Sequence, residues 1–148
     1  MLQEENQLDL RLFRIWMKAT KTVADNIRND IDRYQINNEN FMILELLYSK
    51  GPHPVQKISE TFAIPSGSIT YVVDKLEKKG LVKRLPNPED RRASNVTLTD
   101  EGRALFDEIF PQHVATISQN LSFITEDEKE QLIYLLKKIG LGAKELNS

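Results

Sequence analysis

The stretch from Pro54 to Gly102 constrains the fold of this chain more than any other part of the sequence. It reads PVQKISETFAIPSGSITYVVDKLEKKGLVKRLPNPEDRRASNVTLTDEG, which predicts two short helices joined by a tight turn and followed by a hairpin. In the second helix, the apolar residues are spaced three and four apart: Ile69, Val72, Val73 and Leu76. We therefore expect a mainly α fold with a small two-stranded β wing, that is, a winged helix-turn-helix.

Turn and capping residues mark the ends of these elements. Pro54 suits the first position of the first of the two helices, because its missing N–H would have no intrahelical partner there. Residues 63–65 form the turn, and Ser66 is expected to cap the second helix. Gly80 suits the left-handed conformation that ends a helix.

The hairpin is basic and contains two prolines. Strands are predicted over residues 81–85 and 95–98, joined by a polar tip, PNPEDRR, that cannot be buried. From Ser66 to Arg92 the chain carries seven basic and four acidic residues, a net charge of +3 within a chain whose net charge is −2. Such a segment can neutralise phosphates where it docks, while the other surfaces repel them. A winged helix-turn-helix docks on duplex DNA with one helix in the major groove and the hairpin beside it.

Longer helices are predicted on both sides of this segment. Apolar residues at three- and four-residue spacing predict a helix over about residues 6–34: Leu8, Leu12, Ile15, Ala19, Val23, Ile27 and Ile31. Asn37 or Asn38 can cap the next helix. Thr99 caps another, and Thr125 opens the last with a capping box. The first helix exceeds the average helix length, so the core of one chain is not expected to cover it. We therefore assign residues 1–36 and 104–148 to a dimerisation region and residues 37–103 to a DNA-binding domain.

Composition argues against other classes of protein. The chain has no cysteine, which excludes disulfides and thiolate chemistry. His53 and His113 lie far apart in sequence and could bind a metal only with the help of carboxylates, so we expect both to be ordinary surface or interface residues. The segment 66–68 follows a helical turn, unlike a nucleophile elbow, and no glycine-rich phosphate loop is present. We expect no enzyme, no cofactor and no metal site. Without an apolar run of about 20 residues or a basic, apolar leader, no membrane partner is expected and the cytoplasm is the expected location.

The candidate DNA contacts lie on the second helix of the motif and on the wing. Small hydroxyl residues and lysines on a helix can reach phosphates and base edges, and the candidates here are Ser66, Ser68, Thr70, Tyr71, Lys75 and Lys78. The wing candidates are Arg84, Asp90, Arg91 and Arg92. A wing arginine can enter the narrow minor groove, and a neighbouring aspartate can hold its guanidinium. A solvated helix face and an exposed ion pair remain the alternatives, as does a winged helix that binds another protein.

Three segments carry a family resemblance. GSITYVVDKLEKKGLVKR, the pattern P-x-P-x-DRR and the pattern V-x-LTDEG strongly resemble the winged-helix core of the MarR family of bacterial transcriptional regulators, over about residues 38–103. The resemblance implies a homodimer that binds a palindromic operator in double-stranded DNA and represses nearby genes. It also implies that residues 66–79 form the recognition helix, that Arg92 is the minor-groove arginine and that Asp90 braces it.

The same resemblance implies a small aromatic or phenolic effector. Its site would lie between the dimer helices and the winged domain, with candidate walls Phe13, Trp16, Met17, Tyr48 and Phe62; plain core packing is the alternative for each. The runs GSITYVVDKLEKKG, IFPQH and LKKIG resemble those of regulators that respond to quinone-type or catechol-type compounds.

Overall fold

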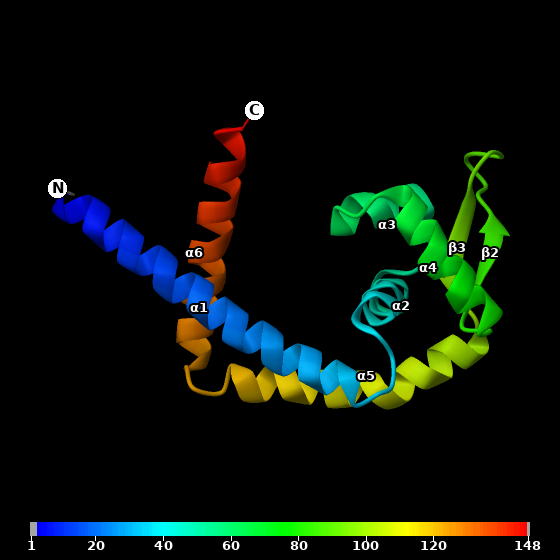
Figure 1. Cartoon of the computed structure of the whole chain (residues 1–148), viewed down its shortest axis with the longest axis horizontal. Helices are drawn as coiled ribbons and strands as arrows, with labels where there is room; N and C mark the ends of the chain where they lie inside the picture. Colours follow the sequence, from blue (N-terminus) through cyan, green and yellow to red (C-terminus); the bar gives the residue numbers. More distant parts are fainter. Residues whose placement is uncertain (1–2, 148) are drawn as a thin grey trace.

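Six helices and three short strands make up the described part of the chain, residues 3–147 of this computed structural model. In chain order they are α1 (Glu4–Asp32), α2 (Asn38–Lys50), β1 (His53–Pro54), α3 (Val55–Phe62), α4 (Ser66–Lys78), β2 (Val82–Pro86), β3 (Ser94–Leu98), α5 (Asp100–Asn120) and α6 (Glu126–Glu145). Figure 1 shows α2, α3, α4 and the strands gathered at one end, while α1 and α6 extend away from them. The predicted fold class is confirmed.

The wing has one strand more than predicted. β2 and β3 form the expected antiparallel hairpin, in which Val82 pairs with Leu98 and Arg84 with Val96. β1 adds a third, antiparallel strand on the other side of β3. It is too short to show an alternating pattern in the sequence, which explains why it was not predicted. Pro54 is therefore the second residue of β1 and precedes α3, rather than being the first residue of that helix as expected.

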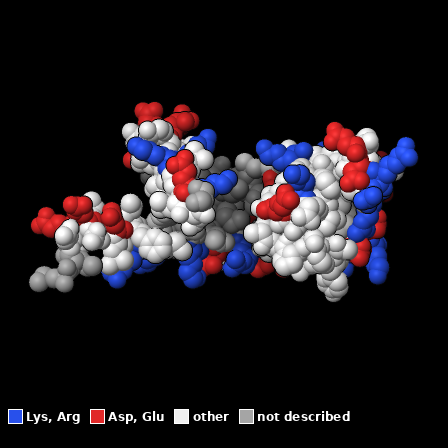
Figure 2. Space-filling model, turned by 90° about the horizontal axis from the view of Figure 1, so that it is seen from above, with Lys and Arg blue, Asp and Glu red and all other residues white. Residues whose placement is uncertain are grey.

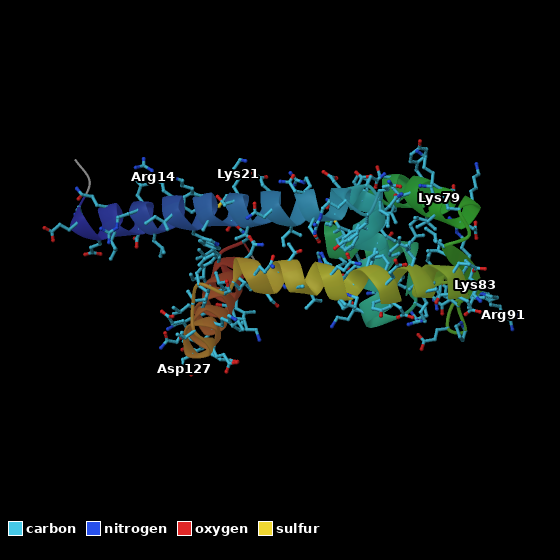
Figure 3. All side chains as sticks on the ribbon, turned by 90° about the horizontal axis from the view of Figure 1, so that it is seen from below. Arg14, Lys21, Lys79, Lys83, Arg91 and Asp127 are labelled. Atoms are coloured by element: carbon cyan, nitrogen blue, oxygen red, sulfur yellow. The ribbon has the colours of Figure 1, made fainter. Side chains whose placement is uncertain are left out.

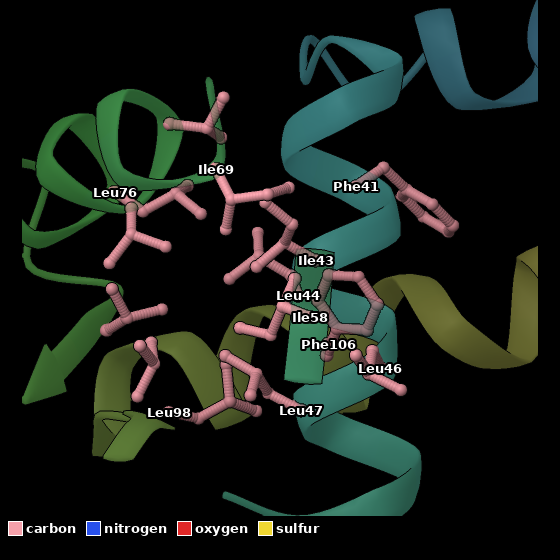
Figure 4. Packing of buried hydrophobic residues seen from close by; sticks show 14 of the residues in the cluster. Phe41, Ile43, Leu44, Leu46, Leu47, Ile58, Ile69, Leu76, Leu98 and Phe106 are labelled. Carbon is pink, nitrogen blue, oxygen red and sulfur yellow. The ribbon is translucent and has the colours of Figure 1, made fainter. Parts of the chain in front are cut away.

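The core is built around α2. Phe41 and Leu44 of this helix are almost completely buried, as are Ile58 of α3, Val73 of α4 and Phe106 of α5. Figure 4 shows such side chains from α2, α3, α4, β3 and α5 meeting in one cluster. Burying each of these large side chains stabilises the fold by about 1.5–3 kcal/mol. α4 and the wing are therefore fixed to a common core.

The capping predictions are largely confirmed. The Asn37 side chain accepts a hydrogen bond from the Asn40 N–H at 2.8 Å, and Thr125 forms the predicted capping box with Glu128. Gly80 adopts a φ of 76°, as its place after α4 requires. The prediction for Ser66 is wrong: Ser66 is the first residue of α4, and Pro65 occupies the capping position. A proline has no side-chain oxygen to accept from the first N–H groups, so α4 begins without a side-chain cap.

α1 and α6 leave apolar surface uncovered. In α6 no described residue is buried, and the stripe predicted from the sequence, Leu132, Leu135, Leu136 and Ile139, is 39–50% exposed. Leu8, Leu12 and Ile15 of α1 are 55–60% exposed. None of the helices in residues 3–147 combines the length and apolar character that crossing a bilayer requires.

Candidate nucleic-acid interface

The outward face of α4 carries all six residues predicted on this helix. Ile69, Val72, Val73 and Leu76 point into the core and are at most 7% exposed. The helical repeat therefore turns the following residues to solvent: Ser66, Ser68, Thr70, Tyr71, Lys75 and Lys78. The face consists of small hydroxyl side chains near its start and lysines near its end.

Some side chains on this face interact with one another. The Lys75 ammonium lies 4.5 Å from the centre of the Tyr71 ring, a cation–π contact that holds both side chains on the surface. The Thr70 hydroxyl donates to the Ser66 carbonyl at 2.9 Å. Ser68 also lines a small apolar cavity between α2 and α4.

The turn before α4 is tightly bonded. Ala63 adopts a left-handed φ of 52°, which is uncommon for a residue with a side chain. The Ser59 hydroxyl donates to the Ile64 carbonyl at 2.5 Å, and the Ile64 N–H donates to the Ser59 carbonyl at 3.2 Å. These bonds fix the angle at which α4 leaves α3.

The wing tip projects freely from the same end of the molecule. The Asp90 carboxylate accepts the backbone N–H of Arg92 at 2.9 Å, and the Asp90 carbonyl accepts the N–H of Ala93 at 3.2 Å. Asp90 therefore shapes the backbone of the tip rather than binding the Arg92 guanidinium. In residues 3–147, Arg91 and Arg92 are exposed and form no ion pair. Figure 3 shows Arg91 extending beyond the hairpin.

Arg84 differs from the other wing candidates. Its guanidinium donates to Asp74 and to Glu77 of α4, both at 2.7 Å, and its side chain is 25% exposed. The structure thus places Arg84 between the wing and α4.

Thr99 and Gly102 join the wing to α5. The Thr99 hydroxyl accepts the Gly102 N–H at 3.0 Å and donates to the Gly80 carbonyl at 2.6 Å. The Thr99 N–H donates to the Leu81 carbonyl at 3.1 Å. A Cβ atom on Gly102 would overlap with that same Leu81 carbonyl oxygen. The run LTDEG is thus a junction in which the end of α4, the end of β3 and the start of α5 meet.

The five candidate effector residues occupy three separate places in one chain. Phe13, Trp16 and Met17 lie on the exposed N-terminal half of α1 and are 38–54% exposed. Tyr48 packs between Phe106 and Phe110 of α5, and its hydroxyl donates to Asp107 at 2.7 Å. Phe62 lines the small cavity beside α4. One chain alone does not bring these five side chains together.

Sequence reasoning missed a buried polar cluster at the end of α1. Asp30, which is 3% exposed, accepts hydrogen bonds from Arg33 and, at 2.8 Å, from the Tyr34 hydroxyl. His113 of α5, expected to be a surface or interface residue, is buried within the chain against the ring of Phe41, with its Nδ1 atom 3.9 Å from the Asp30 carboxylate. The spacing of Asp30, Arg33 and Tyr34 was the available signal, because such positions share one helix face.

The hydrogen bonds of this cluster shift two pKa values. Burial opposes ionisation of Asp30, but hydrogen bonds from Arg33, Tyr34 and Thr116 outweigh it and hold the pKa of Asp30 below its ordinary value. Burial and the hydrogen bond to Asp30 raise the pKa of Tyr34 to about 12. Near neutral pH the cluster therefore holds an ionised aspartate and a neutral tyrosine at the end of α1, and the interaction of Asp30 with Thr116 joins this end to α5.

Among residues 3–147, no group of His, Asp and Glu side chains is placed to hold a metal ion. What the geometry presents instead is an exposed helix face and a projecting hairpin on one side of a shared core. These features define a winged helix-turn-helix protein.

Comparison with known proteins places the chain within that class. The model of the MarR family matches residues 36–94. The HTH-type transcriptional regulator MhqR of Bacillus subtilis (strain 168) is 40% identical over 139 residues, which cover 94% of this chain and 96% of MhqR. The chain belongs to the MarR family, and it is a transcriptional regulator and not an enzyme.

Solved structures agree with this assignment. The fold of AbsC, a MarR family regulator from Streptomyces coelicolor, superposes with a TM-score of 0.82 over 98% of each chain at 17% identity. A mutant MarR from E. coli, complexed with operator DNA, superposes with a TM-score of 0.68 at 25% identity, covering 93% of this chain and 99% of that one.

Proposed function

We propose that this regulator is a homodimeric repressor that binds a palindromic operator and releases it when a small aromatic or phenolic compound binds. The observation that carries the proposal is that the exposed face of α4 and the wing tip lie at the same end of the molecule. Both lie at the end of the molecule where the winged domain is found, and Lys and Arg side chains line the outer edge of this end (Figure 2). Because bacterial DNA lies in the cytoplasm, the regulator would act there.

The recognition helix is proposed to read the major groove. Its exposed residues Ser66, Ser68 and Thr70 are short enough to let the helix approach base edges. Lys75 and Lys78 reach outward from later turns and would contact phosphates. Because α4 lacks a side-chain cap, the N–H groups of its first two residues, Ser66 and Gly67, would also be able to donate to a phosphate, whereas Ser68 N–H donates to the Pro65 carbonyl. Residues 37–103 would thus form the DNA-binding domain.

The wing is proposed to read the minor groove. Arg91 and Arg92 sit at a tip whose backbone is held by Asp90, so little backbone freedom is lost when they insert. An arginine in a narrow minor groove gains from the negative potential concentrated there. The similar fold of the MarR mutant complexed with operator DNA supports DNA binding by this chain.

Residues 1–36 and 104–148 are proposed to form the dimer. α6 buries none of its described residues, and the N-terminal half of α1 exposes Leu8, Leu12 and Ile15. Such continuous apolar faces on two extended helices need a partner, and a second copy offers the same faces. A two-fold dimer would set the two recognition helices about 34–36 Å apart, one turn of B-DNA.

The effector site is proposed to form only in the dimer. Tyr48 and its neighbours on α5 lie beside the cluster around Asp30, where the long helices meet the winged domain, whereas Phe13, Trp16 and Met17 extend away on α1. A partner chain could bring its own α1 residues to that junction. A ligand that binds better when the two winged domains have a different spacing would weaken DNA binding. The loss in binding free energy would equal the difference between the ligand's binding free energies to the two arrangements, about 1–3 kcal/mol.

The direct test is selection of bound duplexes from a random pool, followed by titration of the selected duplex. Arg92→Ala should weaken binding at least about tenfold and leave the unfolding temperature unchanged. Lys50→Ala, at the exposed end of α2 and outside α4, the wing and the proposed dimer region, is the control and should bind normally. Failure of the wild-type protein to select any duplex would remove the proposal. Addition of catechol or a quinone to the complex then tests release.

A further inference from the structure

The Arg84 guanidinium is held by two carboxylates of the recognition helix. Its Nη1 donates to Oε1 of Glu77 and its Nη2 donates to Oδ1 of Asp74, each at 2.7 Å. Asp74 and Glu77 are three residues apart on α4 and therefore lie on one face of the helix. A planar guanidinium can donate to both acceptors at once, which a lysine ammonium on a flexible stem does less well. The neighbouring Lys83 is exposed, whereas Arg84 is 25% exposed.

These contacts leave Arg84 poorly suited to bind a phosphate. Each of the two terminal nitrogens already uses one of its N–H groups to donate to a carboxylate, so the guanidinium cannot turn to a phosphate without giving up these bonds. The three groups together carry a net charge of −1, so the cluster attracts no anion. Moving the guanidinium to a phosphate would also leave two unpaired carboxylates near the DNA backbone, which is unfavourable.

The same contacts join the two elements that must enter adjacent grooves. β2 pairs with β3 along its full length, with Arg84 opposite Val96, and β3 follows directly after the wing tip. The base of the hairpin is anchored by the buried side chains of Val82 and Leu98 and by the bond from Thr99 to the Gly80 carbonyl. The Arg84 cluster adds a direct side-chain attachment to α4 two residues further along β2 toward the tip. This attachment restricts the angle between the hairpin and the helix beyond what the core packing alone provides.

We propose that Arg84 is a positioning residue. Through its bonds to Asp74 and Glu77 it fixes the wing against the recognition helix, and it does not itself neutralise a phosphate. The inference rests on the proposed DNA binding. It replaces the direct DNA contact that the sequence suggested for Arg84.

The salt dependence of DNA binding separates the two roles. Loss of one phosphate contact lowers the slope of log K against log salt concentration by about 0.9, whereas loss of a positioning residue leaves the slope unchanged. We expect Arg84→Met to lower affinity about tenfold at every salt concentration with the wild-type slope. Lys78→Met, at a proposed phosphate contact, should lower both the affinity and the slope. A slope reduced by about 0.9 in Arg84→Met, or an unchanged affinity, would overturn the proposal.

The conservative substitution gives a second test. Arg84→Lys retains the charge but cannot fork two carboxylates, so it should bind DNA as weakly as Arg84→Met. Full recovery of affinity in Arg84→Lys would contradict the proposed role, because a phosphate contact needs only the charge.

A measurement without DNA keeps the test independent of the proposed function. In the free protein, hydrogen exchange at the amides of residues 82–86 and 94–98 should accelerate in Arg84→Met and stay unchanged in the matched control Lys83→Met. Wild-type protection of the α2 amides in both variants shows that the core is folded. Unchanged hydrogen exchange in the wing of Arg84→Met would contradict the positioning role of Arg84. If the wild type binds no duplex, the DNA-binding proposal fails, but this experiment still shows whether Arg84 fixes the wing against α4.

Discussion

At the scale of single residues, Gly102 has the most demanding environment of the described glycines. Its N–H is bonded to Thr99, and a Cβ atom would overlap with the Leu81 carbonyl oxygen, which already accepts from the Thr99 backbone. Gly102→Ala should therefore lower the free energy of unfolding by about 1–3 kcal/mol, because the backbone must shift to admit the methyl group. Urea unfolding of the free protein measures the change.

Gly67 provides the control for that substitution. It lies in the first turn of α4, and a Cβ atom there would meet nothing within 4 Å. Gly67→Ala should leave stability unchanged or raise it by up to about 1 kcal/mol, since alanine is the better helix former. Equal effects at the two positions would show that the close approach at Gly102 is unimportant.

Asp30 makes a pH-dependent contribution to stability. Because its pKa is lowered in the folded protein, that contribution is complete above its unfolded pKa of about 3.9 and is lost as pH falls through the lower folded value. Asp30→Asn should therefore destabilise by about 1–3 kcal/mol at pH 6–7. The difference from the wild type should shrink at pH 3.

Unfolding by urea at a series of pH values tests this expectation. Asp32→Asn, an exposed carboxyl two residues along α1, is the control for removing a charge near the helix end. A difference between wild type and Asp30→Asn that stays constant from pH 7 to pH 3 would exclude the ionised form as the source of the stabilisation.

At the scale of elements, the LTDEG junction determines how the wing meets α5. The Thr99 hydroxyl is the cap of α5 and also bonds the last turn of α4 through Gly80. Thr99→Val, which keeps the shape but removes the hydroxyl, should cost about 1–2 kcal/mol of stability. Thr99→Ser should retain most of it, and thermal unfolding of the two variants would distinguish the hydroxyl from the packing of the side chain.

The elements also show what sequence patterns can and cannot predict. The helices, their asparagine and threonine caps and the hairpin follow from periodicity and capping chemistry, which are local. β1 was missed because its two residues are a strand only through pairing with Val96 and Asn95, distant in sequence. The contacts of Arg84 and the burial of His113 also depend on packing between elements, which spacing along one chain does not reveal.

At the scale of the whole molecule, the chain divides into a packed winged domain and two apolar arms. The core residues lie in the winged domain and where α1 and α5 meet it, whereas α6 has no buried residue among those described. Most of the stability of a helix in a protein comes from packing of its apolar face, so α6 owes part of its stability to whatever covers it. Covering by a second copy would make the arms, the dimer and the operator spacing interdependent.

This interdependence can be tested on opposite sides of α6. Leu132 belongs to the predicted apolar stripe, and Leu141, nine residues later, points the opposite way because successive residues turn by 100°. Leu132→Glu should dissociate the dimer, since it buries a charge in the interface, while Leu141→Glu should remain dimeric. Light scattering after size-exclusion chromatography gives the masses.

The monomer should bind a full palindromic duplex no better than a half-site, because two linked domains bind far more tightly than either alone. A Leu132→Glu protein that stays dimeric, or a monomer that keeps full operator affinity, would show that α6 does not set the spacing of the two winged domains.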